Sequence, residues 1–178
     1  MAVPPVFVSG QVLTAAQMNA IGIWEVKAQT IGTAVSAVTV TDAFTADYDN
    51  YLVMVSGGVA STTNQLRLTL GSTTANYYYA GGGGSFAGAS SLVSGSNVAF
   101  HLFGNGSTNA LSGWSYIIQP NIAKRTQFMG QFMSVDTVGA GWSPVGFLND
   151  ANQYTAFTIT TSTGTMTGGE IRVYGLRN

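Results

Sequence analysis

Residues that could perform acid–base or metal chemistry are few in this sequence. There is one histidine and no cysteine, and Asp and Glu together number seven. Acid–base catalysis needs partners held close to one another, yet His101 stands alone in "VAFHLFG", where alternation sets it opposite Phe100 and Leu102. One histidine excludes the histidine pairs of zinc sites. We therefore interpret His101 as a face residue of a strand and expect no enzyme activity, catalytic residue, metal or cofactor.

Three further stretches approach known motifs without completing them. "GWSPVG" (141–146) lacks the second glycine of a nucleophile elbow, and Pro144 removes the backbone N–H that an oxyanion hole would use. Asp47 and Asp49 lack the glycine and the distal glutamate of an EF-hand loop. The Asn-Gly-Ser that begins at Asn105 matches a glycosylation acceptor, but nothing in the sequence indicates secretion. All three are predicted to be turns.

The elements that must carry these residues are predicted to be strands. In "QLRLTL" (65–70) the three leucines face one way and the Arg and Thr face the other. Stretches rich in β-branched and aromatic residues occur at 23–30, 34–40, 51–55, 98–103, 114–118, 126–133, 154–160 and 170–176. Gly-, Asn- and Ser-rich turns separate them, and no long helical pattern intervenes. The expected fold is all-β, an antiparallel, jelly-roll-like β-sandwich over residues 25–178.

The stretch "NYYYAGGGGSFAGASSLVSGS" (76–96) is predicted to contain a long loop with a flexible run at Gly81–Gly84. A loop rich in Tyr, Gly and Ser has the composition of adaptable recognition surfaces. Alternatively, the tyrosines form the core and rim of one strand that a mobile loop follows. On the first interpretation, the candidate receptor contacts are Tyr77, Tyr78, Tyr79, Phe86 and Trp142.

Residues 1–24 are predicted to be an extended arm with one short helix. "VPPVFV" favours an extended path, and Thr14 with Gln17 forms a capping box that starts a helix over residues 15–21. Seven residues are too few for a stable isolated helix, so its apolar side must be covered. Either the segment docks on a partner, or it plugs one end of its own domain. The residues predicted to make the attachment are Phe7, Leu13, Thr14, Gln17, Met18 and Ile21.

Charge is the unusual global property of the chain. Charged residues make up 7% of the sequence, against about 25% in an ordinary domain. This deficit favours a permanent assembly subunit, because charge is depleted at the centres of interfaces, although a Ser/Thr-rich secreted β-protein is an alternative. Basic residues are dispersed, with Lys124-Arg125 the only adjacent pair, so nucleic acid is not an expected partner. No apolar run approaches the ~18 residues of a membrane span, and the N-terminus does not read as a secretory signal.

Three stretches together resemble small structural proteins of tailed bacteriophages. They are "GQVLTAAQMN" (10–19), "DYDNYLVMVSG" (47–57) and "GTMTGGEIRVYGLRN" (164–178), about a quarter of the chain in the same order. The resemblance implies a β-sandwich, commonly homotrimeric, that is carried on the phage particle and has no catalytic residues. A long fibre shaft and a chaperone domain are missing, which favours a compact tip, a knob or a capsid-surface protein.

The leading hypothesis is thus a non-enzymatic virion protein, assembled in the host cytoplasm and attached through its N-terminus. It would be a trimeric tail-fibre or receptor-binding component whose partners are copies of itself, other tail or capsid proteins and a host cell-surface glycan. A capsid decoration protein or head fibre is the first alternative. A free carbohydrate-binding module, with Tyr and Trp stacking on sugars, is the second.

Overall fold

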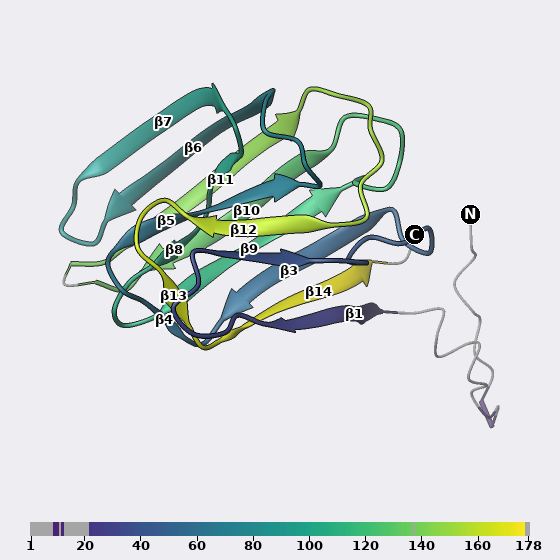
Figure 1. Cartoon of the computed structure of the whole chain (residues 1–178), viewed down its shortest axis with the longest axis horizontal. Helices are drawn as coiled ribbons and strands as arrows, with labels where there is room; N and C mark the ends of the chain where they lie inside the picture. The colour runs from purple at the N-terminus through teal and green to yellow at the C-terminus, as the bar shows by residue number, and fades with distance from the viewer. Residues whose placement is uncertain (1–8, 11, 13–21, 137, 177–178) are drawn as a thin grey trace.

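The computed structural model describes residues 9–10, 12, 22–136 and 138–176, and all regular secondary structure in these residues is β (Figure 1). The strands are β1 (Ile23–Thr30), β2 (Ala37–Val40), β3 (Asn50–Ser56), β4 (Val59–Ala60), β5 (Asn64–Leu70), β6 (Tyr77–Ser85), β7 (Ser90–Asn97), β8 (Phe100–Gly106), β9 (Leu111–Ile118), β10 (Gln127–Ser134), β11 (Ala140–Leu148), β12 (Phe157–Thr161), β13 (Met166–Thr167) and β14 (Glu170–Leu176). The predicted all-β fold is confirmed. The predicted helix at 15–21 lies outside the described residues.

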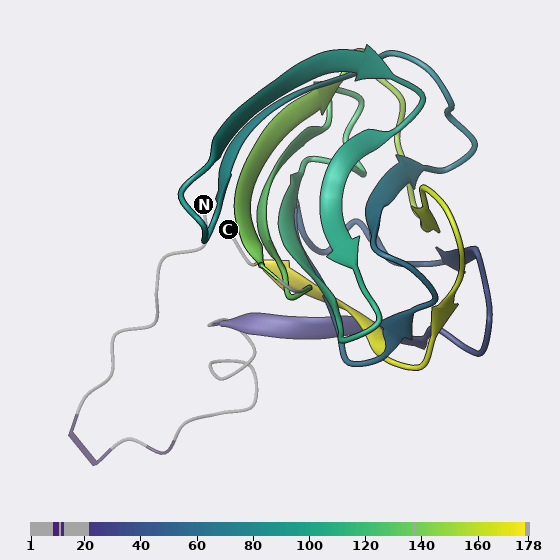
Figure 2. The same cartoon turned by 90° about the vertical axis from the view of Figure 1, so that its left-hand side faces the viewer.

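Two antiparallel sheets form a sandwich. The large sheet has the order β1-β14-β3-β9-β10-β11-β6-β7, and the small sheet has the order β2-β12-β5-β8. The β8–β9 hairpin joins them where Asn105 pairs with Ser112. Figure 2 shows the large sheet curving, with the small sheet on its concave side. A jelly roll has eight strands in its two sheets together, whereas the large sheet of this fold alone contains eight.

The core lies between the concave face of the large sheet and the inner face of the small one. The alternation of "QLRLTL" is confirmed, since Leu66, Leu68 and Leu70 are fully buried. Aromatic rings connect the layers: Phe100 of β8 stacks on Phe128 of β10 at 4.9 Å between ring centroids. Full burial of each such side chain contributes roughly 1.5–3 kcal/mol. The sandwich therefore holds together by apolar packing; the described residues contain no cysteine that could link the sheets.

The glycine-rich stretch is a strand, so the prediction of a loop there was wrong. Gly81–Gly84 lie in β6, which pairs with β11 on one side and with β7 on the other. A Cβ added at Gly83 would overlap the carbonyl oxygen of Gly141 and lie 2.5 Å from Trp142 Cδ2. At Gly83 the neighbouring strand therefore approaches too closely for a side chain.

"GWSPVG" (141–146) was likewise predicted to be a turn and instead lies within β11. Pro144 is buried, and in the β10–β11 ladder the paired positions skip from Met129↔Val145 to Phe132↔Trp142. A proline has no N–H for the ladder, which accounts for an interruption at this point. The strand continues because β6 pairs with it along its whole length.

The turn prediction for Asp47 and Asp49 is confirmed, but the turn predicted at Asn105-Gly106-Ser107 begins later, because Asn105 and Gly106 are the last two residues of β8. Asp47 and Asp49 precede β3, which starts at Asn50, and β8 and β9 form a hairpin around residues 107–110. Asn105 itself ends up buried, and its Nδ2 donates to the carbonyl of Asn64 at 3.0 Å. β1 begins at Ile23, two residues inside the segment predicted to be an arm.

Candidate interaction surface

The convex, outward face of the large sheet is rich in apolar side chains. One row of side chains crosses six neighbouring strands in direct register. In order from β14 to β6 it consists of Tyr174, Leu52, Tyr116, Met129, Val145 and Ala80. We call this row the outer belt. An antiparallel sheet with one face on the core normally presents polar residues on the other, so this face departs from the usual pattern.

Apolar side chains also stand on both sides of the outer belt. Met129 and Val145 are 44% and 51% exposed, and Met54, Phe147 and Tyr78 in the adjacent rows are between 36% and 39% exposed. Polar residues interrupt these adjacent rows, Gln131 and Ser143 on one side of the belt and Gln127 on the other. The continuous apolar surface is therefore the outer belt with its apolar neighbours, and exposed apolar patches on a protein often bind.

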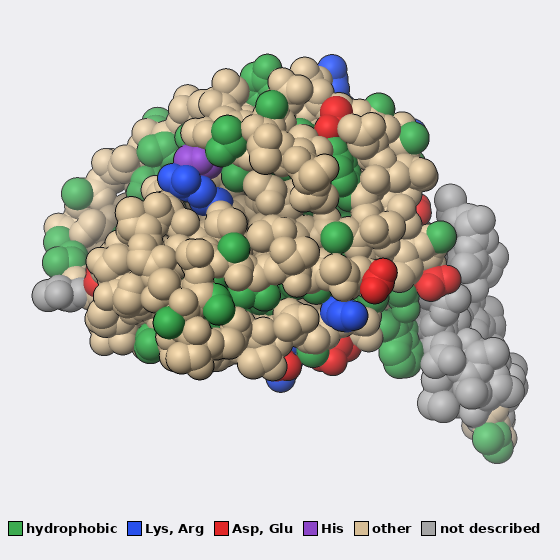
Figure 3. Space-filling model, in the orientation of Figure 1, with side chains coloured by type: hydrophobic (Ala, Val, Ile, Leu, Met, Phe, Trp, Pro, Cys, Tyr) green, Lys and Arg blue, Asp and Glu red, His purple; other side chains and the backbone are tan. Residues whose placement is uncertain are grey.

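Charged side chains on this face lie at its margins: Arg172 on β14, and Arg125, whose guanidinium carbon is 5.8 Å from the centroid of the Phe147 ring. The strands β3, β9, β10, β11, β6 and β7 contain no Asp, Glu, Lys or Arg. On β14, Arg172 pairs with Glu170 at 2.6 Å and lies 3.9 Å from Glu25 of β1. Figure 3 shows the opposite side of the molecule, with the small sheet toward the viewer, where charged side chains form a few separate groups. Aromatic and Met side chains without charge are the composition of an interface centre.

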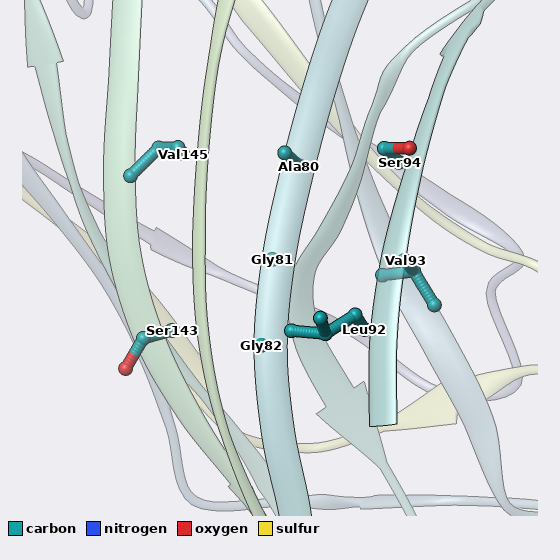
Figure 4. Close-up of a pocket in the computed structure, with 8 residues that line it drawn as sticks. All are labelled: Ala80, Gly81, Gly82, Leu92, Val93, Ser94, Ser143 and Val145. Carbon is teal, nitrogen blue, oxygen red and sulfur yellow. The ribbon is translucent and has the colours of Figure 1, made fainter. Parts of the chain in front are cut away.

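The outward face of the large sheet contains two shallow hollows. The first, of about 260 Å³, is lined by Leu52, Met54, Trp114 and Tyr116. The second, of about 470 Å³, lies over β6 and its neighbours, and its lining residues are Ala80, Gly81, Gly82, Leu92, Val93, Ser94, Ser143 and Val145. Figure 4 shows Leu92 reaching from β7 toward Gly82, with Val145 on the far side of β6. A protruding apolar side chain could enter either hollow.

The tyrosines among the predicted receptor contacts do not share one surface. Tyr77 is fully buried, and its hydroxyl donates to the Thr73 carbonyl at 3.1 Å and accepts from the Leu70 N–H at 2.8 Å. Burial raises the pKa of this phenol. Tyr78 lies on the outward face and stacks on Phe147, with ring centroids 5.2 Å apart. Tyr77 is thus part of the core.

The other candidates point elsewhere. Tyr79 faces the opposite side of β6 from Tyr78 and stacks on His101 at 5.2 Å. Phe86, in the turn between β6 and β7, is 67% exposed and close to Gly139. Trp142 stacks on Phe132, with centroids 6.3 Å apart. Receptor contact stays a prediction for the exposed candidates, and the predicted attachment residues from Phe7 to Ile21 lie outside the described residues.

Groups suited to chemistry remain dispersed within the described part of the chain. His101 is half-buried on β8, and burial, followed by the nearby Arg67 charge, lowers its pKa. Ser143 is exposed on β11 with neither His nor a carboxylate among the residues of its hollow. In the described ranges, no three His, Asp or Glu residues gather where a metal could bind. The same residues contain no helix long and apolar enough to cross a membrane.

Sequence reasoning missed the residues of the outer belt, although a signal for them exists. "YLVMV", "WSYII" and "QFMGQFM" carry apolar residues at both odd and even positions. Such a pattern is typical of strands that are covered on both faces. Only the strand order brings Met54, Trp114, Met129 and Val145 onto one continuous surface.

Comparisons of the chain with models of known protein families, with curated proteins and with solved structures give no match.

Proposed function

We propose that this protein is a non-enzymatic structural subunit that works by association, with copies of itself and with other proteins of a virus particle. The observation that carries the proposal is the outer belt, an uncharged apolar row of side chains that crosses six strands. Burial of apolar surface contributes ~25 cal/mol of favourable free energy per Å², and side chains left in water do not gain it. A subunit whose working state covers the outer belt gains this free energy on assembly.

The particle we propose is that of a tailed bacteriophage, because the three stretches at 10–19, 47–57 and 164–178 resemble its small structural proteins. Residues 1–22 would attach the subunit, and β1 would begin the folded body directly after them. The tail-fibre or receptor-binding role is the first choice within this proposal. A capsid decoration role differs from it in copy number, which would reach tens to hundreds per particle.

The first experiment measures incorporation into particles of the phage that encodes the chain. Purified particles should contain the protein, and its copy number should follow from quantitative gel densitometry. Deleting residues 1–22 leaves the β1–β14 pairing intact, so the shortened chain should fold but fail to join particles. Particles that lack the full-length protein, or that accept the truncated one normally, would contradict the proposal.

The second experiment tests the outer belt itself. Met129→Lys and Val145→Lys each place a charge on an exposed position of the belt, so the fold should survive while incorporation falls at least tenfold. Val59→Lys is the matched control, since Val59 is an exposed apolar strand residue (38%) in β4, outside the large sheet. Equal incorporation of all three variants would exclude the belt as the assembly surface. Glycan binding by the isolated protein would instead favour a carbohydrate-binding module.

A further inference from the structure

The open edges of the two sheets are protected unequally. An edge strand presents unpaired N–H and C=O groups that can pair with another chain, and proteins blunt such edges with charges, bulges, proline or short length. β1, one edge of the large sheet, carries Glu25 and Lys27 with a register shift between them. β2, an edge of the small sheet, has only four residues. Both of these edges are blunted.

β7, at the other end of the large sheet, has none of these devices. It pairs with β6 in an unbroken register of eight residues, from Tyr77↔Asn97 to Gly84↔Ser90. Its sequence, "SSLVSGSN", contains no charge and no proline, and six of its eight residues are exposed. Leu92 is 89% exposed, the largest fraction among the exposed large apolar side chains of the described residues. A long, regular, uncharged edge of this kind is a template for strand pairing.

We infer that β7 pairs antiparallel with β7 of a second copy of this chain, so that two large sheets become one. This inference rests on the proposed function, because it assumes that the chain works by association. An isologous two-fold contact requires a surface that complements itself. A strand of Ser, Gly, Leu and Val meets that requirement, because no like charges face each other when it pairs with its own copy. The blunted edge of β1 is a poor partner for it.

The register of this pairing is constrained by the two faces of the sheet. Directly opposite residues in antiparallel strands lie on the same face. Ser94 pairs with Ala80 and Leu92 with Gly82, which puts the even-numbered residues of β7 on the outward face. A pairing that keeps both outward faces on one side therefore sets even-numbered residues against even-numbered residues. The hollow over Gly82 of each copy (Figure 4) then lies beside the paired β7 strands, and the two outer belts lie on the same side of one sheet, with the two β7 strands between them.

The test uses the full chain and begins with its mass in solution. Light scattering after size exclusion should give a dimer for the unmodified protein. Leu92→Lys and Ser94→Lys each add an edge charge at an exposed position, and each should raise the dimer dissociation constant at least tenfold. Val59→Lys, on β4, should leave it unchanged, and circular dichroism should show the same β content for all four proteins. A monomer, a trimer, or a dimer indifferent to both β7 substitutions would overturn the inference.

A second measurement reports the register independently of stability. The chain contains no cysteine, so single Cys substitutions at each of the eight β7 positions from Ser90 to Asn97 provide unique cross-linking positions, whichever residue lies on the two-fold axis. Opposed residues have Cα atoms ~4.5–5.5 Å apart, within the ~4.4–6.8 Å range of disulfides. Mild oxidation should cross-link one of these positions far more than Ser143→Cys on β11. Equal cross-linking at Ser143, or none at β7, would overturn the pairing.

These results separate the inference from the proposed function. A β7-dependent dimer of a protein that never enters particles would support the pairing and remove the proposed function. Incorporation that depends on Met129 and Val145, with a protein that is monomeric in solution, would support the proposed function and overturn the pairing.

Discussion

Replacing Gly83 by Ala should destabilise the fold, whereas the same change at the adjacent Gly82 should not. At Gly83 the added methyl group would overlap the Gly141 carbonyl oxygen and lie 2.5 Å from Trp142 Cδ2. At Gly82 its nearest neighbour is Cδ2 of Leu92 at 3.1 Å, the end of an exposed side chain that can rotate away. Both glycines lie in β6, so strand propensity is the same for the two.

The matched pair isolates the steric cost. Gly→Ala gains ~0.4–1 kcal/mol by restricting the unfolded chain where the native backbone tolerates alanine, and this gain is common to both variants. Accommodating the methyl at Gly83 requires β11 to retreat by roughly 1 Å, and overpacking of this kind costs ~1–3 kcal/mol. The free energy of unfolding of Gly83→Ala should therefore be about 1–3 kcal/mol below that of Gly82→Ala. For a chain of this size the gap in Tm is roughly 2–12 °C.

Urea unfolding followed by tryptophan fluorescence measures the difference, and Trp142 lies beside the substituted position. Differential scanning calorimetry supplies the two Tm values under the same buffer. If Gly83→Ala were as stable as Gly82→Ala, β11 would not approach β6 as closely as described. The explanation of Gly83 by close strand approach would then be refuted.

Two further predictions concern buried polar groups. Tyr77→Phe should lower the free energy of unfolding by about 1–3 kcal/mol, because the buried Leu70 N–H loses the hydroxyl to which it donates. Urea titration measures this free energy, and an unchanged midpoint would contradict the hydrogen bond between Leu70 and Tyr77. For His101, burial lowers the pKa in the folded state, so the unfolded chain binds more protons as the pH falls below ~6.5 and stability is lost there. His101→Phe, which can still stack on Tyr79, should abolish that part of the pH dependence. The Tm values of the unmodified protein and the variant, measured between pH 5 and 8, should diverge on acidification. Parallel curves would show that His101 does not cause the loss of stability.

The strands could be predicted from the sequence because their signal is local. Residues 23–30 and 170–176 are strands with the predicted bounds, since dense β-branched and aromatic residues flanked by turn-formers need no information from elsewhere in the chain. The prediction of a loop at the glycine run was wrong for the opposite reason, because the signal there is not local. Gly81–Gly84 have loop composition, and only the pairing with β11 shows that they form a strand and that Gly83 has no room for a side chain.

The candidate surface could be predicted only in part. Apolar residues on both faces of "WSYII" and "QFMGQFM" indicate that something covers the outward side of these strands. Which strands are neighbours is non-local, however, because β6 pairs with β11 and β3 with β9 across long stretches of chain. The three consecutive tyrosines show what the sequence leaves open. Alternation along a strand predicts that Tyr78 faces away from Tyr77 and Tyr79, but only the fold shows that the side of Tyr77 is the core.

The position of β14 has a consequence for synthesis. This strand, from Glu170 to Leu176, fits between β1 and β3 and hydrogen-bonds to both. Until the ribosome has released it, β1 lacks its neighbour and β3 keeps an open side, although both precede β14 by more than 100 residues. Completion of the sandwich must therefore wait until every strand from β1 to β14 has been made, and such long-range closure is slow. Nascent copies on one messenger would meet with complementary edges still exposed, which favours contact between sister chains during translation.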